Sequence, residues 1–230
     1  MGWKQFYRKT FEQEWENSQN WGDLSPYKLT VGADVYYCVG YIGTAIGYWL
    51  LSPKIQHPQG VRTRIRIKYF FWVDANATGG ADIAVVFYKN DETSKDPNGN
   101  DVHGAAHSIS TPPESNLAEE HEFVMEYDGS NKITWSVDGE KLGETTLELP
   151  LSSFKVGIMV EYTVNGNAGI AIYEVVGEYY DQWEDWINQI YGIMQWMIPA
   201  MFVIMLVVMV VSALRGKKQE EERKVIVVPG

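Results

Sequence analysis

The chain has 230 residues and carries 30 acidic side chains against 19 Lys and Arg, which gives a formal net charge of −11 at pH 7. A net charge of this sign argues against a general nucleic-acid binder, because phosphate backbones would be repelled. Cys38 is the only cysteine, which excludes an intrachain disulfide and a cysteine-built zinc site. For an exported domain, this lack of disulfides favours a prokaryotic or viral protein.

The first long uncharged stretch runs from Val35 to Pro53 and is rich in tyrosine and glycine. This composition is typical of buried strands with tight bends rather than of a helix that faces lipid. We therefore expect strands here and not a membrane span.

A predicted strand from 62 to 73 follows, and cations occupy every second position of its first half. These residues are Arg62, Arg64, Arg66 and Lys68, and we call them the basic ridge. Their spacing places them on one face of the strand, where they are a candidate docking stripe for anionic glycans, lipid headgroups or an acidic subunit. The alternative is that carboxylates of neighbouring strands, such as Glu122, Glu126 or Glu161, pair with them across the sheet.

After a predicted strand at 81–88, the longest polar interruption is a loop predicted for residues 89–107. Four of its oxygen-bearing side chains have a spacing that resembles a calcium loop: Asp96, Asn98, Asn100 and Asp101. No Glu stands where such a loop supplies its bidentate ligand, so a turn-rich loop without metal is the alternative. We expect no cofactor, with calcium as the remaining candidate.

The next segments alternate between apolar and polar residues with a period of two. Residues 122–127 and 132–137 flank the turn sequence Asp128–Asn131, which predicts a hairpin, and Asp138-Gly139 predicts a further turn. A strand is predicted at 156–162, a turn at 165–167 and another strand at 168–176. Many strands with almost no helix predict a mainly β fold of two packed antiparallel sheets.

The segment HEFVMEYDGSNKITWSVDGEKLGE, residues 121–144, resembles a hairpin of concanavalin-A-like, laminin-G-like jelly-roll domains. Phe11 and the Trp21–Asp23 segment are similar to the family's opening Phe and Trp, and AGIAIYEVVGEY near residue 170 is similar to its closing strand. The resemblance implies a two-sheet antiparallel jelly-roll sandwich whose last strand returns beside the first. We assign this domain to residues 1–180.

The resemblance implies either glycan binding or glycan hydrolysis. Laminarinase-type members carry a Glu, an Asp two residues later and a Glu three further on, along one strand. The nearest approach here is Glu120, Glu122 and Glu126, with Glu in the middle place and Met125 in the third. Glu126 would lie over ~13 Å from Glu122 along a strand, beyond either kind of catalytic pair. We therefore predict that the protein is not an enzyme, with a glycosidase as the minor alternative.

The run from Trp186 to Leu214 contains no charged residue and predicts one transmembrane helix within residues 181–214. Acidic residues precede it and basic residues follow it, so the positive-inside rule places the sandwich outside and residues 215–230 inside as a short tail. Aromatic and basic side chains at its ends are the expected membrane-interface anchors. They are Trp183, Trp186, Tyr191, Trp196, Arg215, Lys217 and Lys218.

The inner tail ends on an apolar, β-prone segment made of Val225, Ile226, Val227 and Val228. Such a segment is a candidate for docking to a partner sheet as an added strand. A frayed or membrane-touching end is the alternative.

These features predict a non-catalytic, membrane-anchored surface protein that is a structural component of a cell envelope or of a membrane-containing virion. Its expected partners are the lipid bilayer and other envelope or virion proteins, including further copies of itself. The alternative is a lectin-like receptor or adhesin that binds glycans.

Overall fold

The computed structural model describes residues 2–11, 21–44, 46–74, 79–89, 104–110, 119–146, 151–160 and 165–225. The chain divides into two compact units: Trp3–Tyr180, which holds every described strand, and a second unit that contains the single described helix. The strands are β1 (Trp3–Thr10), β2 (Ser25–Val31), β3 (Asp34–Gly43), β4 (Leu50–Leu51), β5 (Ile55–Gln56), β6 (Thr63–Val73), β7 (Gly80–Lys89), β8 (Gly104–Ser110), β9 (Glu119–Tyr127), β10 (Lys132–Val137), β11 (Glu140–Thr146), β12 (Leu151–Val160) and β13 (Ala168–Tyr180), and the helix is α1 (Gln182–Val225).

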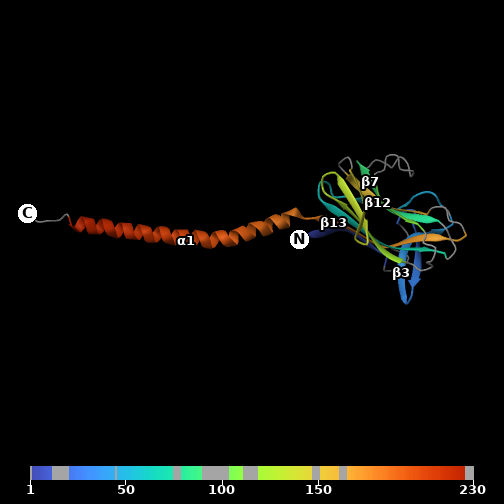
Figure 1. Cartoon of the computed structure of the whole chain (residues 1–230), viewed down its shortest axis with the longest axis horizontal. Helices are drawn as coiled ribbons and strands as arrows, with labels where there is room; N and C mark the ends of the chain where they lie inside the picture. Colours follow the sequence, from blue (N-terminus) through green and yellow to red (C-terminus); the bar gives the residue numbers. More distant parts are fainter. Residues whose placement is uncertain are drawn as a thin grey trace, which may run out of the picture. The chain divides into compact units, whose positions relative to one another are not determined.

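The first unit is built from two antiparallel sheets (Figure 1). The larger sheet has the order β11-β10-β9-β6-β13-β3-β2, and β1 also pairs with β13; the smaller has the order β4-β12-β7-β8, and β5 also pairs with β12. The long strand β13 pairs with β3 through its first half and with β1 through its second half. The last strand therefore lies beside the first, as the resemblance implied.

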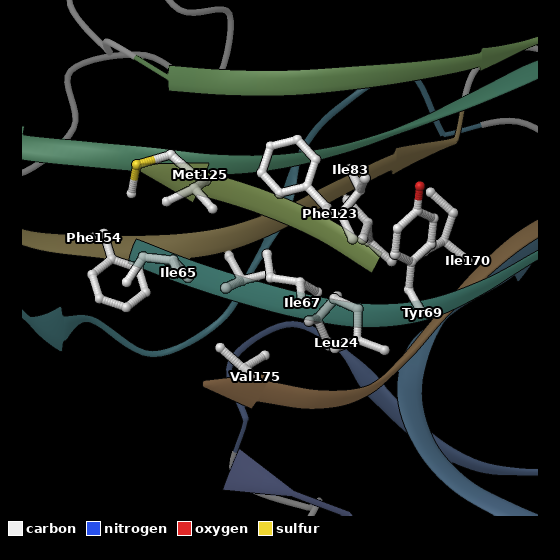
Figure 2. Packing of buried hydrophobic residues seen from close by; sticks show 14 of the residues in the cluster. Leu24, Ile65, Ile67, Tyr69, Ile83, Phe123, Met125, Phe154, Ile170 and Val175 are labelled. Atoms are coloured by element: carbon white, nitrogen blue, oxygen red, sulfur yellow. The ribbon is translucent and has the colours of Figure 1, made fainter. Parts of the chain in front are cut away.

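Apolar side chains of both sheets meet between the layers. Figure 2 shows Ile65 and Ile67 of β6 and Phe123 of β9 in this cluster, together with Ile83 of β7 and Phe154 of the smaller sheet's β12. In β9 and in the first half of β6 these apolar residues alternate with polar ones, so one face of each strand turns inward, because side chains of a strand point to opposite faces in turn. The predicted two-sheet β-sandwich is confirmed.

The predicted hairpin of residues 122–137 is confirmed as β9 and β10. At the next turn Asp138 and Gly139 have φ of 50° and 83°, the left-handed conformation of the two-residue turns that suit twisted antiparallel strands. This turn leads into β11, which the sequence analysis did not predict.

The loop predicted for residues 89–107 is wrong at both ends, because Lys89 belongs to β7 and Gly104–Ser110 forms β8 against β7; residues 90–103 lie outside the described residues. The sequence of β8, GAAHSIS, has Ile109 as its one strongly strand-forming residue, so local propensity for a strand is weak and pairing with β7 stabilises β8. The predicted strand 156–162 instead begins at Leu151, and its described part ends at Val160.

The helix α1 includes the stretch Trp186–Gln219, which is long and apolar enough to cross a bilayer. Pro199 lies inside the helix without ending it. The prediction ended the helix at Leu214, whereas the structure continues it to Val225. The reason is that Lys, Gln, Glu and Arg, which make up most of residues 215–224, favour helix.

Candidate functional site

The outer face of the larger sheet carries a second apolar cluster, separate from the core between the sheets. Cys38, Phe70 and Ala171 form its buried floor. Partly buried side chains pack around this floor: Tyr27, Leu29, Val31, Tyr36, Trp72 and Tyr173. We call the five rings of Tyr27, Tyr36, Phe70, Trp72 and Tyr173 the aromatic patch.

The rings of the aromatic patch contact one another. The ring centroid of Phe70 lies 4.6 Å from that of Tyr36 and 5.2 Å from that of Tyr173, and the Tyr36 and Tyr173 centroids are 5.5 Å apart. Tyr27 meets Trp72 edge to face at 5.9 Å. These distances are typical of favourable aromatic pairs, so the rings hold one another in place.

Two glycines allow the outer rings to lie close to the sheet. A Cβ atom at Gly169 would overlap the Trp72 ring, and one at Gly40 would come within 2.8 Å of the Tyr27 hydroxyl oxygen. The Tyr27 hydroxyl donates a hydrogen bond of 2.9 Å to the carbonyl of Ile170. Burial raises the pKa of Tyr27 well above its ordinary value, so this donor keeps its proton.

A carboxylate borders the patch. Glu120 lies opposite Phe70 in the β6–β9 register and is exposed. Burial raises the pKa of Tyr173, and the adjacent Glu120 carboxylate, which accepts a hydrogen bond from the Tyr173 hydroxyl, raises it further. The patch therefore combines partly exposed rings with a hydrogen-bonding acid at its margin.

The basic ridge lies on the same outer face of β6, and its cations are paired. Arg62 binds Glu126 at 3.1 Å and Arg66 binds Glu122 at 3.0 Å, as the pairing alternative proposed for those two carboxylates. The remaining contacts go to β13, whose carboxylates the sequence analysis did not name: Arg64–Glu178 at 2.6 Å, Arg66–Glu178 at 3.2 Å and Lys68–Glu174 at 3.3 Å. Glu161 lies outside the described residues.

These ion pairs form because β6 lies between β9 and β13, so carboxylates reach the ridge from both sides. Burial alone would raise the pKa of Glu178, but Arg64 and Arg66 outweigh it and hold that pKa below its ordinary value. The cations are thus largely neutralised within the sheet, and a docking role for the ridge stays a prediction.

The carboxylates considered for catalysis have other contacts. Glu122 and Glu126 are held by arginines of the ridge, and Glu120 accepts from Tyr173. Within the described part of the chain, no group of three or more His, Cys, Asp or Glu side chains is placed to hold a metal ion. The calcium-loop candidates, Asp96, Asn98, Asn100 and Asp101, lie outside the described residues.

The proposed interface anchors all lie on α1, with exposed side chains. They are Trp183, Trp186, Tyr191, Trp196, Arg215, Lys217 and Lys218. Val225 is the last residue of this helix rather than the start of an extended segment, which corrects the prediction for the tail at that position. Ile226, Val227 and Val228 lie outside the described residues, so their docking role stays a prediction.

The aromatic patch was not among the predicted sites. A signal was present in the uninterrupted apolar run Tyr69–Val73, since a strand that is apolar at every position is covered on both faces. Tyr27 and Tyr36 come from other strands, and only the pairing of β2, β3, β13 and β6 brings them to this run.

No protein-family model matches the sequence, and neither does any curated protein. Among solved structures, the chain is similar to the Emp47p carbohydrate recognition domain, with 11% identity over 78% of this chain and 97% of that chain and a TM-score of 0.47. It is also similar to lectin II from Ulex europaeus, with 10% identity, coverage of 77% and 100% and a TM-score of 0.47. An endo-β-1,4-glucuronan lyase from Trichoderma reesei matches with 10% identity, coverage of 76% and 95% and a TM-score of 0.40.

These neighbours are mostly lectin-type, concanavalin-A-like jelly-roll domains, the family that the sequence resembles. At such identities and TM-scores, none of the likenesses bears on ligand or activity. The architecture itself follows from the strand order and the core described above.

Proposed function

We propose that the protein is a membrane-anchored, non-catalytic β-sandwich that binds glycans through the aromatic patch. The observation that carries this proposal is the set of four partly exposed rings packed around the buried Phe70 on the outer face of the larger sheet. A contiguous group of partly exposed apolar rings is typical of a binding surface.

Sugar rings suit this surface chemically. The C–H groups on one face of a pyranose carry partial positive charge, and the face of an aromatic ring carries partial negative charge, so the two stack favourably. The hydroxyls at the sugar's edge then find hydrogen-bond acceptors such as Glu120 beside the patch. Tyr and Trp side chains give large contact areas at low entropic cost.

The patch is also pre-organised. Trp72 lies against Gly169 and Tyr27, and Tyr27 is hydrogen-bonded to the β13 backbone. Rings that are already fixed lose little freedom when a ligand binds, so more of the contact energy appears as affinity.

The anchoring part of the proposal rests on α1. Its described side chains from Trp186 to Gln219 are exposed within the chain, so their apolar surface needs another environment, and a bilayer supplies it. Lys217 and Lys218 follow the uncharged run that ends at Leu214, and Glu178 and Asp181 precede that run. By the positive-inside rule, we propose that the sandwich lies outside and the C-terminus inside.

A structural role in an envelope or virion, which the sequence analysis favoured, becomes the second outcome to test. The candidate docking features for that role were the basic ridge and the apolar tail. The cations of the ridge are bound to carboxylates of the same sheet, and Ile226, Val227 and Val228 of the tail lie outside the described residues.

The test is a glycan array with the full-length protein in lipid nanodiscs. We expect binding to a subset of glycans, and we expect Trp72→Ala to weaken it by about tenfold or more, because central aromatic residues dominate binding energy. Tyr48→Ala is the matched control, since Tyr48 is an exposed ring outside the patch.

If the wild-type protein binds no glycan, or if Trp72→Ala binds as well as wild type, the glycan proposal is wrong. Self-association in detergent, measured by light scattering and abolished by Trp72→Ala, would instead support assembly through the same patch.

A further inference from the structure

A second aromatic cluster lies at the end of the sandwich where β13 finishes. Trp3 of β1 is paired with Tyr180 of β13, and their ring centroids are 5.5 Å apart in an edge-to-face arrangement. The guanidinium groups of Arg64 and Arg62 lie 4.3 Å and 5.3 Å from the Trp3 ring centroid, and Arg62 also lies 5.7 Å from that of Tyr180. We call Trp3, Arg62, Arg64 and Tyr180 the arginine–aromatic rim.

Backbone pairing fixes the rim. The amide of Tyr180 donates to the carbonyl of Arg62 at 2.7 Å, and the β1–β13 register sets Trp3 opposite Tyr180. Three chain segments distant in sequence therefore present these side chains together.

The rim keeps capacity for a further ligand. The Arg62 side chain is 46% exposed, and it bonds to the Glu126 carboxylate through Nη2 at 3.1 Å. A guanidinium has five N–H donors, so others can reach a second acceptor. The planar guanidinium group matches the geometry of phosphate as well as that of carboxylate, so phosphate is a suitable second acceptor.

Chain connectivity limits how far the rim can be from a membrane. Asp181 alone separates Tyr180 from Gln182, the first residue of α1, and the apolar stretch begins at Trp186. Two extended residue steps and four helical ones keep the Tyr180 Cα within about 13 Å of the Trp186 Cα. The headgroup layer of a bilayer leaflet is about 5–8 Å deep, so the rim is tethered close to it.

We infer that the arginine–aromatic rim binds phospholipid headgroups of the membrane that holds α1. Arg62 binds headgroup phosphate, and the Trp3 and Tyr180 rings lie at headgroup level, where amphipathic rings are favoured. This inference rests on the proposed membrane anchoring of α1 and does not depend on glycan binding.

The charges around the rim favour headgroups that carry both a positive and a negative charge. Glu126 and Glu178 stand beside the two arginines, so the rim is not a simple cationic patch. A zwitterionic headgroup complements it, because phosphate meets the Arg62 guanidinium group while the ammonium meets the carboxylates and aromatic faces.

The test places spin labels on the full-length protein in phosphatidylcholine nanodiscs. Gln5→Cys reports on the rim, since Gln5 is exposed and lies two residues from Trp3 on β1. Ile42→Cys is the matched control, because exposed Ile42 pairs with Gly169 near the other end of β13. Leu206→Cys reports on α1, and the buried Cys38 does not compete for the label.

We expect the label at Leu206 to be protected from an aqueous relaxation reagent and the label at Gln5 to lose most of its collision rate relative to Ile42. Both Trp3→Ala and Arg62→Gln should restore the accessibility of the Gln5 label. Arg62→Gln leaves the Trp3–Tyr180 packing in place, so its result stands even if Trp3→Ala disturbs β1, which circular dichroism would reveal.

If the Leu206 label is protected but Gln5 is as accessible as Ile42, or if Arg62→Gln changes nothing, the rim inference is wrong and anchoring stands. An accessible label at Leu206 overturns anchoring and the rim inference together, while the glycan array still reports on the patch.

Discussion

The two halves of β6 share one outer face, but the side chains on that face are charged in the first half and aromatic in the second. The first half carries the basic ridge, whose cations are bound by carboxylates of β9 and β13. The second half carries Phe70 and Trp72, whose rings meet tyrosines of β2, β3 and β13. Neighbouring strands thus decide what a strand face offers: the ridge is satisfied within the sheet, while the patch keeps partly exposed apolar surface.

The largest effect is expected from acid, which should lower the free energy of unfolding through a histidine that contacts the ridge half of β6. Behind it, on the inner side, His57 lies 2.7 Å through Nε2 from the Thr63 hydroxyl at the start of β6, and burial lowers its pKa from the ordinary 6.5 to about 4. Between these values the unfolded chain binds a proton that the folded chain does not, so stability falls as the pH drops from 6.5 to 4, by at most about 3 kcal/mol.

Urea unfolding at pH 7, 5.5 and 4.5 measures this loss. His57→Gln is the control, because its amide can still bond to Thr63 but does not titrate, and it should flatten the pH dependence over this range. An equally steep dependence in His57→Gln would show that other groups are responsible.

The second largest effect is expected from removing the carboxylate that two arginines of the ridge share. Glu178→Ala leaves Arg64 and Arg66 without their common partner, and the Glu178 side chain is only 14% exposed. We expect a loss of about 2 kcal/mol in the free energy of unfolding, because partly buried cations lose their compensation. Denaturant titration measures it.

Glu144→Ala is the control for that variant, since Glu144 bonds two lysines at an exposed site on β11. It should cost little, as exposed ion pairs generally do. Equal losses in the two variants would contradict the view that the ridge network is distinct from ordinary surface pairs. Glycan binding should survive both changes, because neither touches the aromatic patch.

In the aromatic half, Tyr27→Phe removes one hydrogen bond and keeps the ring. Without the 2.9 Å bond to the Ile170 carbonyl, the protein should lose about 1 kcal/mol of stability. Glycan affinity should change far less than in Trp72→Ala, since the ring still packs against Trp72. Thermal unfolding and isothermal titration check the two parts, and a loss of affinity equal to that of Trp72→Ala would show that the hydroxyl itself binds ligand.

The smallest effect is expected at the exposed end of the ridge. Arg62→Gln removes the pair with Glu126, in which both side chains are over a third exposed, and should change stability by less than about 0.5 kcal/mol. A larger loss in denaturant titration would mean that the cation–π contacts with Trp3 and Tyr180 stabilise the fold itself. A small loss leaves this variant suitable for testing the rim against lipid.

Much of the sandwich was predictable where local pattern and tertiary structure agree. The β9–β10 hairpin combines strict alternation with the turn Asp128–Asn131, so both its strands and its connection follow from neighbouring residues. The strands β1, β2 and β8 were not predicted, because each is stabilised by pairing with another strand: β13, β3 and β7, respectively. Local propensity is a weak guide where the partner strand supplies the stability.

By itself, the sequence determined the mainly β fold, the apolar helix and the outward placement of the basic ridge, because each follows from spacing along one stretch of chain. Only the tertiary structure decided that the ridge meets Glu174 and Glu178 and that Tyr27, Tyr36 and Tyr173 gather around Phe70 and Trp72. The alternation of a strand specifies which face a side chain is on, whereas the order of strands in the sheet specifies its neighbours.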